Sequence, residues 1–410
     1  MSQTLLGFLG YGKPKTSPTS NALSTTQGLT STWYRSDAIY QLERRAIFSR
    51  RWILVSHKNR FGANGDYVRF EEAGFQFFLC KDREGKISGF HNTCRHRAFP
   101  IVTEPRGQAR ILACKYHGWT YGLNGKLTKA PGYEEMEGFD RLQNNLFPIN
   151  VHIDAIGFIW VNLDVQKEVQ WDDDFKGVDK QERFSIFNFD DYRFDHTWEM
   201  SGEYNWKTLA DNYNECYHCP TSHPDVRGQV DVKFYSVDTN AGHIQHQGQP
   251  PTRVLQDWQK VCSTYYFPNA CMTVTSHFFY LMRCVPTSVD RCSMEYEVYR
   301  HKDASDEDFN NIDSMFKRVL SEDKWLCTNV QKNLSAGVFV SGEMHSRMEK
   351  GPLYVQQTVR RQVQEHYQRE KQLQREIWPA RQLSSTSSMN IEQDESFCAS
   401  VACQNEELVW

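Results

Sequence analysis

Two short motifs that pair a cysteine with a histidine constrain this chain more than any other feature. Cys94 stands two residues before His96, and Cys114 stands three residues before His117. Each motif supplies one sulfur and one nitrogen ligand, and residues 97–113 separate the two motifs. The pattern therefore predicts a metal centre that is held by two thiolates and two imidazoles on two neighbouring loops.

Two kinds of centre accept this set of ligands. In a Rieske-type [2Fe–2S] cluster two histidines bind one iron and two cysteines bind the other, so each loop gives one ligand to each iron. A structural zinc site also takes two Cys and two His, but its spacing groups like residues together. Residues 90–92 and 118–122 also resemble the surroundings of Rieske clusters, although Lys115 stands where many relatives carry proline. We therefore interpret the four motif residues as cluster ligands.

The composition is that of a globular protein with more than one domain. The chain has 410 residues, of which 39% are hydrophobic and 24% are charged, so two domains can each bury a core. A net charge of −4 gives no reason to expect nucleic-acid binding, and no apolar run approaches the length of a membrane span. The 12 cysteines, without a secretory signal, are expected to be reduced thiols of an intracellular protein.

The first 34 residues carry no clear structural signal. They hold no acidic residue and are rich in serine and threonine, which resembles an organelle transit peptide, but they also lack arginine. No positive segment precedes the short apolar run at residues 5–9, so a secretory signal peptide is not expected. We expect a disordered arm and a cytoplasmic protein.

The order of the predicted elements indicates an α+β chain. Short alternating strands with turns between them fill residues 45–165, including a hairpin at Asn124-Gly125. Beyond a charged, aromatic linker at 166–195, further strands are followed by two long helices, at 305–334 and 354–376. The predicted parts are an arm with a short helix (1–44), an all-β domain (45–165), a second domain (166–382) and a disordered tail (383–410).

A second metal site is predicted at the end of a helix that we expect over residues 202–217. Glu215 and His218 are three residues apart, which places them on one face of a helix. His223 does not share that face, but Pro220 disfavours helical backbone before it, so the chain should turn and bring His223 back towards His218. Two histidines with a carboxylate form the facial triad of a non-haem Fe(II) oxygenase.

The carboxylate of this triad is predicted from a later helix. Apolar residues recur at helical spacing through residues 312–334, and Asp323 falls on the same face, three residues after Leu320 and four before Cys327. An aspartate on a face that packs into the core must be paired, protonated or bound to a metal. The alternative is an ion pair with a buried arginine. Glu322 points elsewhere and is the weaker candidate for the third ligand.

Cys216 and Cys219 are interleaved with these predicted iron ligands. Their spacing is that of a redox or zinc motif, but no second pair of the same spacing exists to complete a site with four cysteines. We expect both to be reduced residues that pack against their neighbours rather than a site of their own.

Together these residues resemble the oxygenase component of the Rieske non-haem iron oxygenases. The resemblance covers about residues 33–380, and the sequence of residues 215–220 (ECYHCP) is most similar to that of the choline monooxygenase and carnitine monooxygenase branch. The family implies an all-β Rieske [2Fe–2S] domain followed by a catalytic domain with a helix-flanked antiparallel sheet (helix-grip, START-like). It also implies a homotrimer in which the cluster of one subunit faces the mononuclear Fe(II) of the next. The iron ligands that match the family pattern are His218, His223 and Asp323.

The resemblance gives Glu215 a role between the two metal centres. In the family an acidic residue at this position hydrogen-bonds the iron-binding histidine of its own subunit and a cluster histidine of the neighbour, here His218 and either His96 or His117. Glutamate in place of the more usual aspartate departs from the aromatic ring dioxygenases and favours the choline-like branch. The family further implies O₂ as co-substrate. It also implies a separate NAD(P)H-dependent flavin and iron–sulfur reductase, since this chain has no nucleotide-binding glycine motif.

The substrate is the least constrained part of this interpretation. A quaternary ammonium group calls for an aromatic cage, although aromatic residues on core strands also serve as plain core. We expect a choline-monooxygenase-like oxidation of a small quaternary ammonium compound, such as choline to betaine aldehyde. The alternatives are an aromatic ring-hydroxylating or demethylating oxygenase, and a Rieske electron-transfer protein without oxygenase activity. The candidates for the cage are Tyr265, Tyr266, Phe267, Phe278, Phe279 and Tyr280.

Overall fold

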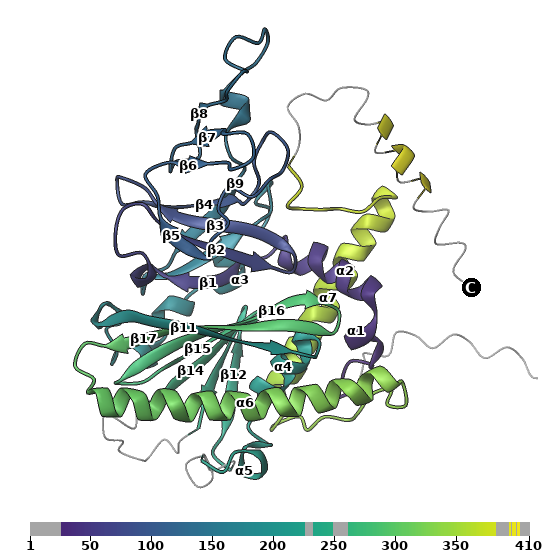
Figure 1. Cartoon of the computed structure of the whole chain (residues 1–410). Helices are drawn as coiled ribbons and strands as arrows, with labels where there is room; N and C mark the ends of the chain where they lie inside the picture. The colour runs from purple at the N-terminus through teal and green to yellow at the C-terminus, as the bar shows by residue number, and fades with distance from the viewer. Residues whose placement is uncertain are drawn as a thin grey trace, which may run out of the picture.

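Two antiparallel sheets, one above the other, form the frame of the molecule, and helices cover the outer face of the lower sheet (Figure 1). None of the described helices is long and apolar enough to cross a membrane. This is the predicted α+β arrangement, with an all-β body first and a sheet-and-helix body second. The computed structural model describes residues 26–225, 233–248, 261–382, 393–394, 396–398 and 400–401.

The first body holds a seven-stranded sheet, in the order β1-β10-β9-β4-β3-β2-β5, and a small sheet β6-β7-β8 above it. Gly125, in the turn between β7 and β8, has φ +78°, and a Cβ there would lie 2.3 Å from the ring of Phe90. The predicted hairpin turn therefore requires glycine, both for its backbone and for its packing. The strands are β1 (Ile53–His57), β2 (Asp66–Glu72), β3 (Phe75–Lys81), β4 (Ile87–His91), β5 (Arg106–Gln108), β6 (Leu112–Ala113), β7 (Thr120–Tyr121), β8 (Leu127–Lys129), β9 (Pro148–Ile153) and β10 (Phe158–Asn162).

The second body is built on a seven-stranded sheet in the order β11-β17-β16-β15-β14-β13-β12. Strands β12 to β17 follow one another as neighbours, and β11 pairs with β17 at the far edge. Side chains alternate between the two faces, as strand geometry requires. The strands are β11 (Tyr192–Gly202), β12 (Ser236–Asn240), β13 (His243–Gln247), β14 (Cys262–Tyr266), β15 (Ala270–Val274), β16 (Phe278–Ser288) and β17 (Arg291–His301).

The long helix α6 runs across the lower sheet (Figure 1). It begins after Ser305, whose hydroxyl accepts from Asp308 N at 3.1 Å, and it ends at Gly337, where φ is +76°. Both ends follow the usual capping rules, and the predicted helix at 305–334 is confirmed. The helices are α1 (Thr32–Arg35), α2 (Asp37–Glu43), a π-helical turn (Arg44–Phe48), α3 (Trp171–Phe175), α4 (Trp206–Tyr213), α5 (Cys219–Ser222), α6 (Asp306–Ala336) and α7 (Lys350–Leu373); short 3₁₀ turns lie at Lys58–Arg60, Leu142–Asn144, Val178–Lys180, Glu182–Phe184 and Phe189–Asp191.

Two expectations about connecting segments are corrected by the packing. Residues 166–195 are not a loose linker, because Trp171, Phe175 and Phe189 are buried in one cluster with the first body and the lower sheet. Residues 26–34 are not a free arm either: Ser31 N donates to Val340 O at 2.7 Å, and Leu29 and Tyr34 are buried. Aromatic and leucine side chains at these positions supply the apolar area that holds the segments in place. Residues 1–25 and most of the predicted tail lie outside the described residues.

Candidate metal centres

The two Cys/His motifs form two loops of equivalent geometry at the end of the first body that lies farthest from the lower sheet (Figure 1). Cys94 N donates to Phe99 O at 2.9 Å, and Cys114 N donates to Trp119 O at 2.8 Å. The residue four after each cysteine returns a hydrogen bond to the cysteine carbonyl oxygen, 3.0 Å in both loops, and has positive φ. The backbone therefore follows the same path around the cysteine in both loops.

The loops bring the four predicted cluster ligands together. The ring centroids of His96 and His117 are 4.5 Å apart. Burial raises the pKa of the Cys94 thiol, and the adjacent Cys114 thiol raises it further. Nδ1 of His96 is buried and has no hydrogen-bond partner among the described residues. Two facing thiols and an unpaired inward imidazole nitrogen fit a [2Fe–2S] cluster of the Rieske kind, whose irons would use these atoms.

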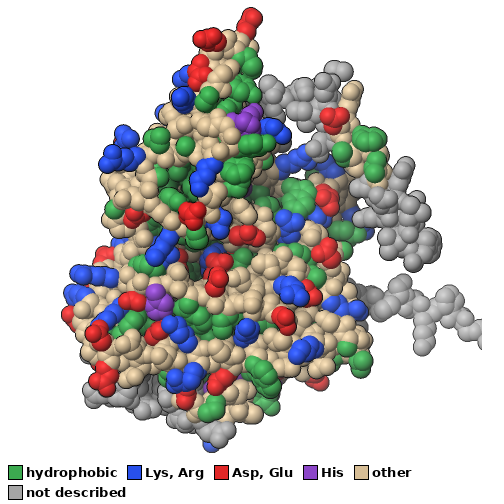
Figure 2. Space-filling model, viewed as in Figure 1, with side chains coloured by type: hydrophobic (Ala, Val, Ile, Leu, Met, Phe, Trp, Pro, Cys, Tyr) green, Lys and Arg blue, Asp and Glu red, His purple; other side chains and the backbone are tan. Residues whose placement is uncertain are grey.

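The two histidines of these loops have different surroundings. His96 stacks on Trp119, with ring centroids 5.3 Å apart and planes 8° apart, and its Nε2 lies 3.2 Å from the hydroxyl oxygen of Tyr133. His117 is exposed, and its side chain makes no hydrogen bond to the described part of the chain. Beside the loops, the exposed carboxylates of segment 134–137 gather at the tip of the molecule (Figure 2).

The second site begins on α4, which a buried ion pair fixes to the N-terminal helices. Lys207 Nζ lies 2.6 Å from one carboxylate oxygen of Glu43, and Trp206 Nε1 donates to the other at 2.8 Å. The helix was predicted to reach residue 217, but it ends at Tyr213, one turn earlier. The reason lies in the Glu215 carboxylate, which accepts hydrogen bonds from the backbone N–H groups that follow it and so stabilises a turn instead of helix.

The turn and α6 bring the predicted triad together at the opposite end of the molecule from the cluster loops (Figure 1). His218 Nε2 and His223 Nε2 are 3.1 Å apart, and Asp323 Oδ1 lies 3.4 Å and 3.2 Å from them. Three ligands at about 2.1 Å from one metal and at right angles to each other would be about 3.0 Å apart. Asp323 Oδ1 is also buried, and its polar contacts within the described chain are with these two imidazole nitrogens. These three atoms fit a facial metal site.

Each histidine of the triad is oriented by a glutamate on its other nitrogen. Glu215 Oε1 hydrogen-bonds Nδ1 of His218, and Glu322 Oε2 lies 2.7 Å from Nδ1 of His223. Such a bond fixes the ring plane and leaves Nε2 for the metal. The expectation that Glu322 points elsewhere is therefore corrected. Helical spacing placed it off the buried face, but its longer, partly exposed side chain reaches His223 from the edge of the helix.

The charges around the triad favour proton binding by the imidazoles. Burial lowers the pKa of His218, but hydrogen bonds to Asp323 and Glu215 outweigh burial and raise it to about 9. The pKa of His223 is also raised, since Asp323 and Glu322 outweigh burial there too. Burial raises the pKa of Asp323, whereas its contacts with the two histidines bring it below the usual value. A divalent cation bound at this point would take the place of those protons.

Cys216 and Cys219 lie inside this turn and form a disulfide with each other. The expectation of two reduced packing residues is corrected, because the turn between Glu215 and α5 brings their Cα atoms to 5.0 Å, within the range that a disulfide spans. The sulfur of Cys219 also lies within 4.8 Å of ligand nitrogens of His218 and His223. Since that sulfur is engaged in the disulfide, Asp323 is the better third ligand.

Aromatic rings lie on the face of the lower sheet that packs against α6. Tyr296 stacks on Trp198 with ring centroids 3.7 Å apart, and Tyr280 lies 5.3 Å from the ring of Phe316 on α6. Burial raises the pKa of Tyr280 and Tyr296 most, and the Asp323 carboxylate adds to the rise in both. The hydroxyl of Tyr296 is buried and has no partner among the described residues. This aromatic face is therefore within electrostatic reach of the candidate metal ligands.

The six candidates for the cage do not all lie on one side of the sheet. Tyr265, Phe267, Phe278 and Tyr280 belong to the hydrophobic cluster that includes the helix side of the sheet, whereas Tyr266 and Phe279 pack with segment 166–195 on the other side. Strand alternation separates neighbours in this way, so a run of consecutive aromatic residues cannot line one site. Trp198 and Tyr296, which come from other strands, pack in the same cluster as the first four.

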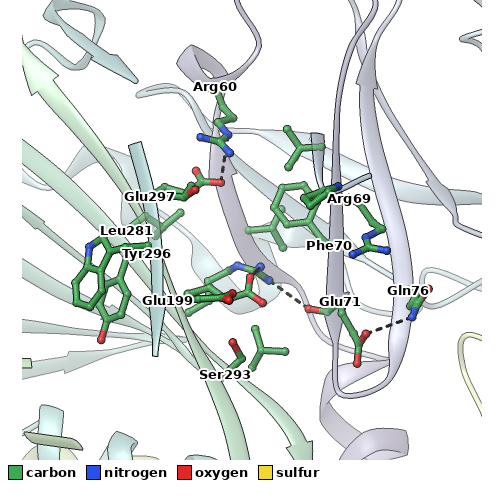
Figure 3. A pocket seen from close by; sticks show the side chains of 18 of the residues that line it. Arg60, Arg69, Phe70, Glu71, Gln76, Glu199, Leu281, Ser293, Tyr296 and Glu297 are labelled. Atoms are coloured by element: carbon green, nitrogen blue, oxygen red, sulfur yellow. Dashed lines mark hydrogen bonds and ion pairs between the residues drawn. The ribbon is translucent and has the colours of Figure 1, made fainter. Parts of the chain in front are cut away.

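A cavity of about 700 Å³ opens between the two sheets (Figure 3), and none of the candidate metal ligands lines it. Arg283 lies at its wall, paired with the buried Glu72 of β2 at 3.1 Å and with Glu295 of β17. Arg60 lies over the ring of Phe194, 3.6 Å from its centroid. These contacts cross from the first body to the second and hold the two in one orientation.

Comparison with known proteins identifies both bodies. The family model described as Rieske [2Fe-2S] domain matches residues 51–141, and the model described as ring hydroxylating alpha subunit (catalytic domain) matches residues 189–365. The first match contains the two Cys/His loops, and the second contains the candidate triad. The sequence pattern placed the cluster ligands in the first domain and the triad in the second, and these matches agree with both placements.

Relatives and solved structures of similar length are known. Choline monooxygenase of Beta vulgaris, described as chloroplastic, is 28% identical over 78% of this chain and 74% of its own. The carnitine monooxygenase oxygenase subunit of Acinetobacter baumannii is 23% identical over 74% of this chain and 84% of its own. A quaternary ammonium Rieske monooxygenase solved with L-carnitine has a TM-score of 0.73 at 23% identity, over 82% of this chain and 96% of its own. A naphthalene 1,2-dioxygenase has a TM-score of 0.68 at 17% identity, over 83% and 93%.

Proposed function

Because the chain carries a Rieske domain and the catalytic domain of ring-hydroxylating oxygenases, and so belongs to the Rieske non-haem iron oxygenases, we propose that it oxidises a small quaternary ammonium compound. Membership makes it an oxygenase component that uses a [2Fe–2S] cluster and a mononuclear iron and that receives electrons from a separate reductase. The choice of monooxygenation and of substrate class is the proposal.

We assign the ligands of both groups from the geometry described above. Cys94 and Cys114 would hold one iron of the cluster, and His96 and His117 the other. His218, His223 and Asp323 would hold the mononuclear iron, which supplies O₂ activation at its open coordination positions. The convergence of the last three ligand atoms within 3.1–3.4 Å is the observation that carries the assignment of this oxygenase site. Glu215 and Glu322 keep the imidazoles in the orientation that this requires.

The positions of the two centres support an assembly of several chains. The cluster loops and α5 lie at opposite ends of the molecule (Figure 1), so the cluster of one chain cannot serve its own iron directly. A head-to-tail ring of three would place the cluster loops of one subunit against Glu215 of the next. His117 suits this contact better than His96, because it is exposed and has no hydrogen bond in the described chain. Glu215 would then join His218 in its own subunit to His117 of the neighbour.

The aromatic face that packs against α6 supports a cationic substrate. Aromatic rings attract a quaternary ammonium group through their electron-rich faces and do not require a hydrogen bond, which such a group cannot donate. Trp198, Tyr280, Tyr296 and Phe316 could supply these faces on the iron side of the sheet. Both relatives named above are monooxygenases of choline or carnitine by description, which agrees with this choice.

The test is turnover with a generic Rieske reductase and NADH against choline, carnitine, glycine betaine and a set of aromatic acids. We expect O₂-dependent product from a quaternary ammonium compound and none from the aromatic acids. Asp323→Ala should abolish this activity. If only an aromatic acid gives product, ring hydroxylation or demethylation replaces the proposal. An apolar aromatic face would also suit those reactions. An iron content of about two per chain instead of about three would indicate an electron carrier.

A further inference from the structure

Tyr133 places its hydroxyl against one of the two cluster histidines. The oxygen lies 3.2 Å from His96 Nε2, and the two rings meet edge to face with centroids 5.6 Å apart. Tyr133 follows β8 in a turn where its own N–H donates to Ala130 O at 2.9 Å. Its ring packs against Trp119 at 5.1 Å and Phe139 at 5.2 Å. The hydroxyl is therefore held in position from both sides.

The direction of this hydrogen bond follows from the other nitrogen of the ring. His96 Nδ1 is buried, points inwards and has no partner within the described residues, as an iron ligand requires. A neutral imidazole that binds through Nδ1 carries its proton on Nε2. His96 Nε2–H then donates to the oxygen of Tyr133. His117 has no equivalent bond in the described chain.

We propose that Tyr133 is a positioning residue for the cluster. By accepting the Nε2–H of His96, it fixes the plane of that imidazole and makes it a stronger electron donor to its iron than His117 is. A stronger donor stabilises the oxidised cluster, so the bond lowers the reduction potential. The same bond occupies His96 within its own chain and leaves His117 as the imidazole that a neighbouring carboxylate can reach.

This inference rests on the proposed ligand set, but not on the proposed substrate. The experiment therefore uses the full-length, cluster-loaded protein without reductase or substrate. Tyr133→Phe keeps the ring and its packing and removes only the hydroxyl. Tyr67→Phe is the matched control: Tyr67 is a partly buried tyrosine of the same hydrophobic cluster, and its hydroxyl lies beside Gly107 instead of a ligand.

The readouts are the reduction potential from a dye-coupled titration and the nitrogen couplings of the reduced cluster from pulsed electron paramagnetic resonance. In Tyr133→Phe the reduced-to-oxidised ratio at a fixed potential should rise about 5-fold, the effect of losing one hydrogen bond. The couplings of one imidazole should change and those of the other should not. Tyr67→Phe should match the wild type in both measurements.

Three results would overturn the proposal. The first is a Tyr133→Phe protein with wild-type potential and couplings, which would make Tyr133 a packing residue. The second is an equal shift in Tyr67→Phe, which would make the effect general to the domain. The third is an equal change in both imidazoles. A wild-type protein without a Rieske signal would refute the ligand set itself, whereas failure of the turnover assay alone would refute only the proposed substrate.

Discussion

The two metal centres of this chain differ in how completely the chain itself supports their histidines. At the iron site, Glu215 and Glu322 each hold Nδ1 of one histidine, so both rings are oriented before any metal binds. At the cluster site, Tyr133 holds His96, while His117 is exposed and makes no hydrogen bond within the described residues. At the iron site the single chain supports both histidines, whereas the cluster site leaves one imidazole exposed.

This difference agrees with the tasks that we assign to the two centres. An iron that activates O₂ needs fixed ligands and exclusion of water, and its triad is largely buried between the turn and α6. A cluster that delivers electrons must approach a partner, and an exposed imidazole provides the contact. The asymmetry supports the proposal that another subunit supplies the missing half of the cluster's surroundings.

The largest expected effect separates the two centres completely. Asp323→Ala removes the carboxylate that completes the triad, so the protein should lose turnover and its iron content should fall from about three to about two per chain. The visible spectrum of the cluster should remain. Asp313→Ala, on the same helix and paired with Lys317, is the control and should keep all of the iron. If Glu322→Ala loses the iron and Asp323→Ala does not, the assignment of the third ligand is wrong.

The reverse separation is expected from the cluster side. His117→Cys replaces an imidazole ligand with a thiolate, and the high potential of a Rieske centre depends on its imidazoles. The electron paramagnetic resonance signal should change to that of a cluster with four cysteines or disappear. The mononuclear iron should stay bound, because its ligands lie at the other end of the chain. An unchanged signal would contradict the cluster assignment.

The iron site should also show a pH dependence with a definite sign. The pKa of His218 in the metal-free protein is raised to about 9, so its proton is bound at neutral pH and must leave when a metal enters. Apparent affinity for Fe(II) should therefore increase with pH and level off above about 9, being about 100-fold lower at pH 7. Anaerobic titration at several pH values, with measurement of released protons, checks this. Affinity that is independent of pH would show that Nε2 of His218 is not a ligand.

A smaller effect tests whether the glutamates orient the histidines. Glu322→Gln keeps an acceptor for His223 but loses the charge that strengthens the bond. Fe(II) affinity should fall about 10- to 100-fold, the range for loss of such supporting bonds, and Glu322→Ala should fall at least as far. Saturating Fe(II) should restore much of the activity of the Gln variant. Wild-type affinity in both variants would leave Glu322 without the role that the geometry gives it.

Candidate ligand positions could be predicted from the sequence because metal ligands combine rare residue types with short spacings. The Cys/His motifs came from spacing alone, and Asp323 came from a charged residue on an apolar helix face, where burial demands a partner. Both signals are local, and α6 formed as predicted, with Ser305 at its start.

The residues that sequence reasoning missed act through contacts between segments that are far apart in the chain. Tyr133 reaches His96 across 37 positions, and Glu322 reaches His223 across 99. No spacing rule reports such pairs. The candidates for the cage divide between the two sides of the sheet for a different reason. Consecutive residues of a strand face opposite sides, so only half of any run can line one site.

The claim that Glu215 joins the two centres of neighbouring subunits is tested most directly by single-turnover oxidation of the pre-reduced cluster with O₂ and substrate. Glu215→Gln keeps the shape of the side chain and loses its charge, so at saturating Fe(II) all irons should stay bound and the reductase should still reduce the cluster. Oxidation of the cluster should slow by at least about 10-fold, because the charge-assisted bonds that hold the two imidazoles are weakened. Wild-type oxidation rates in this variant, or loss of its mononuclear iron, would contradict the account.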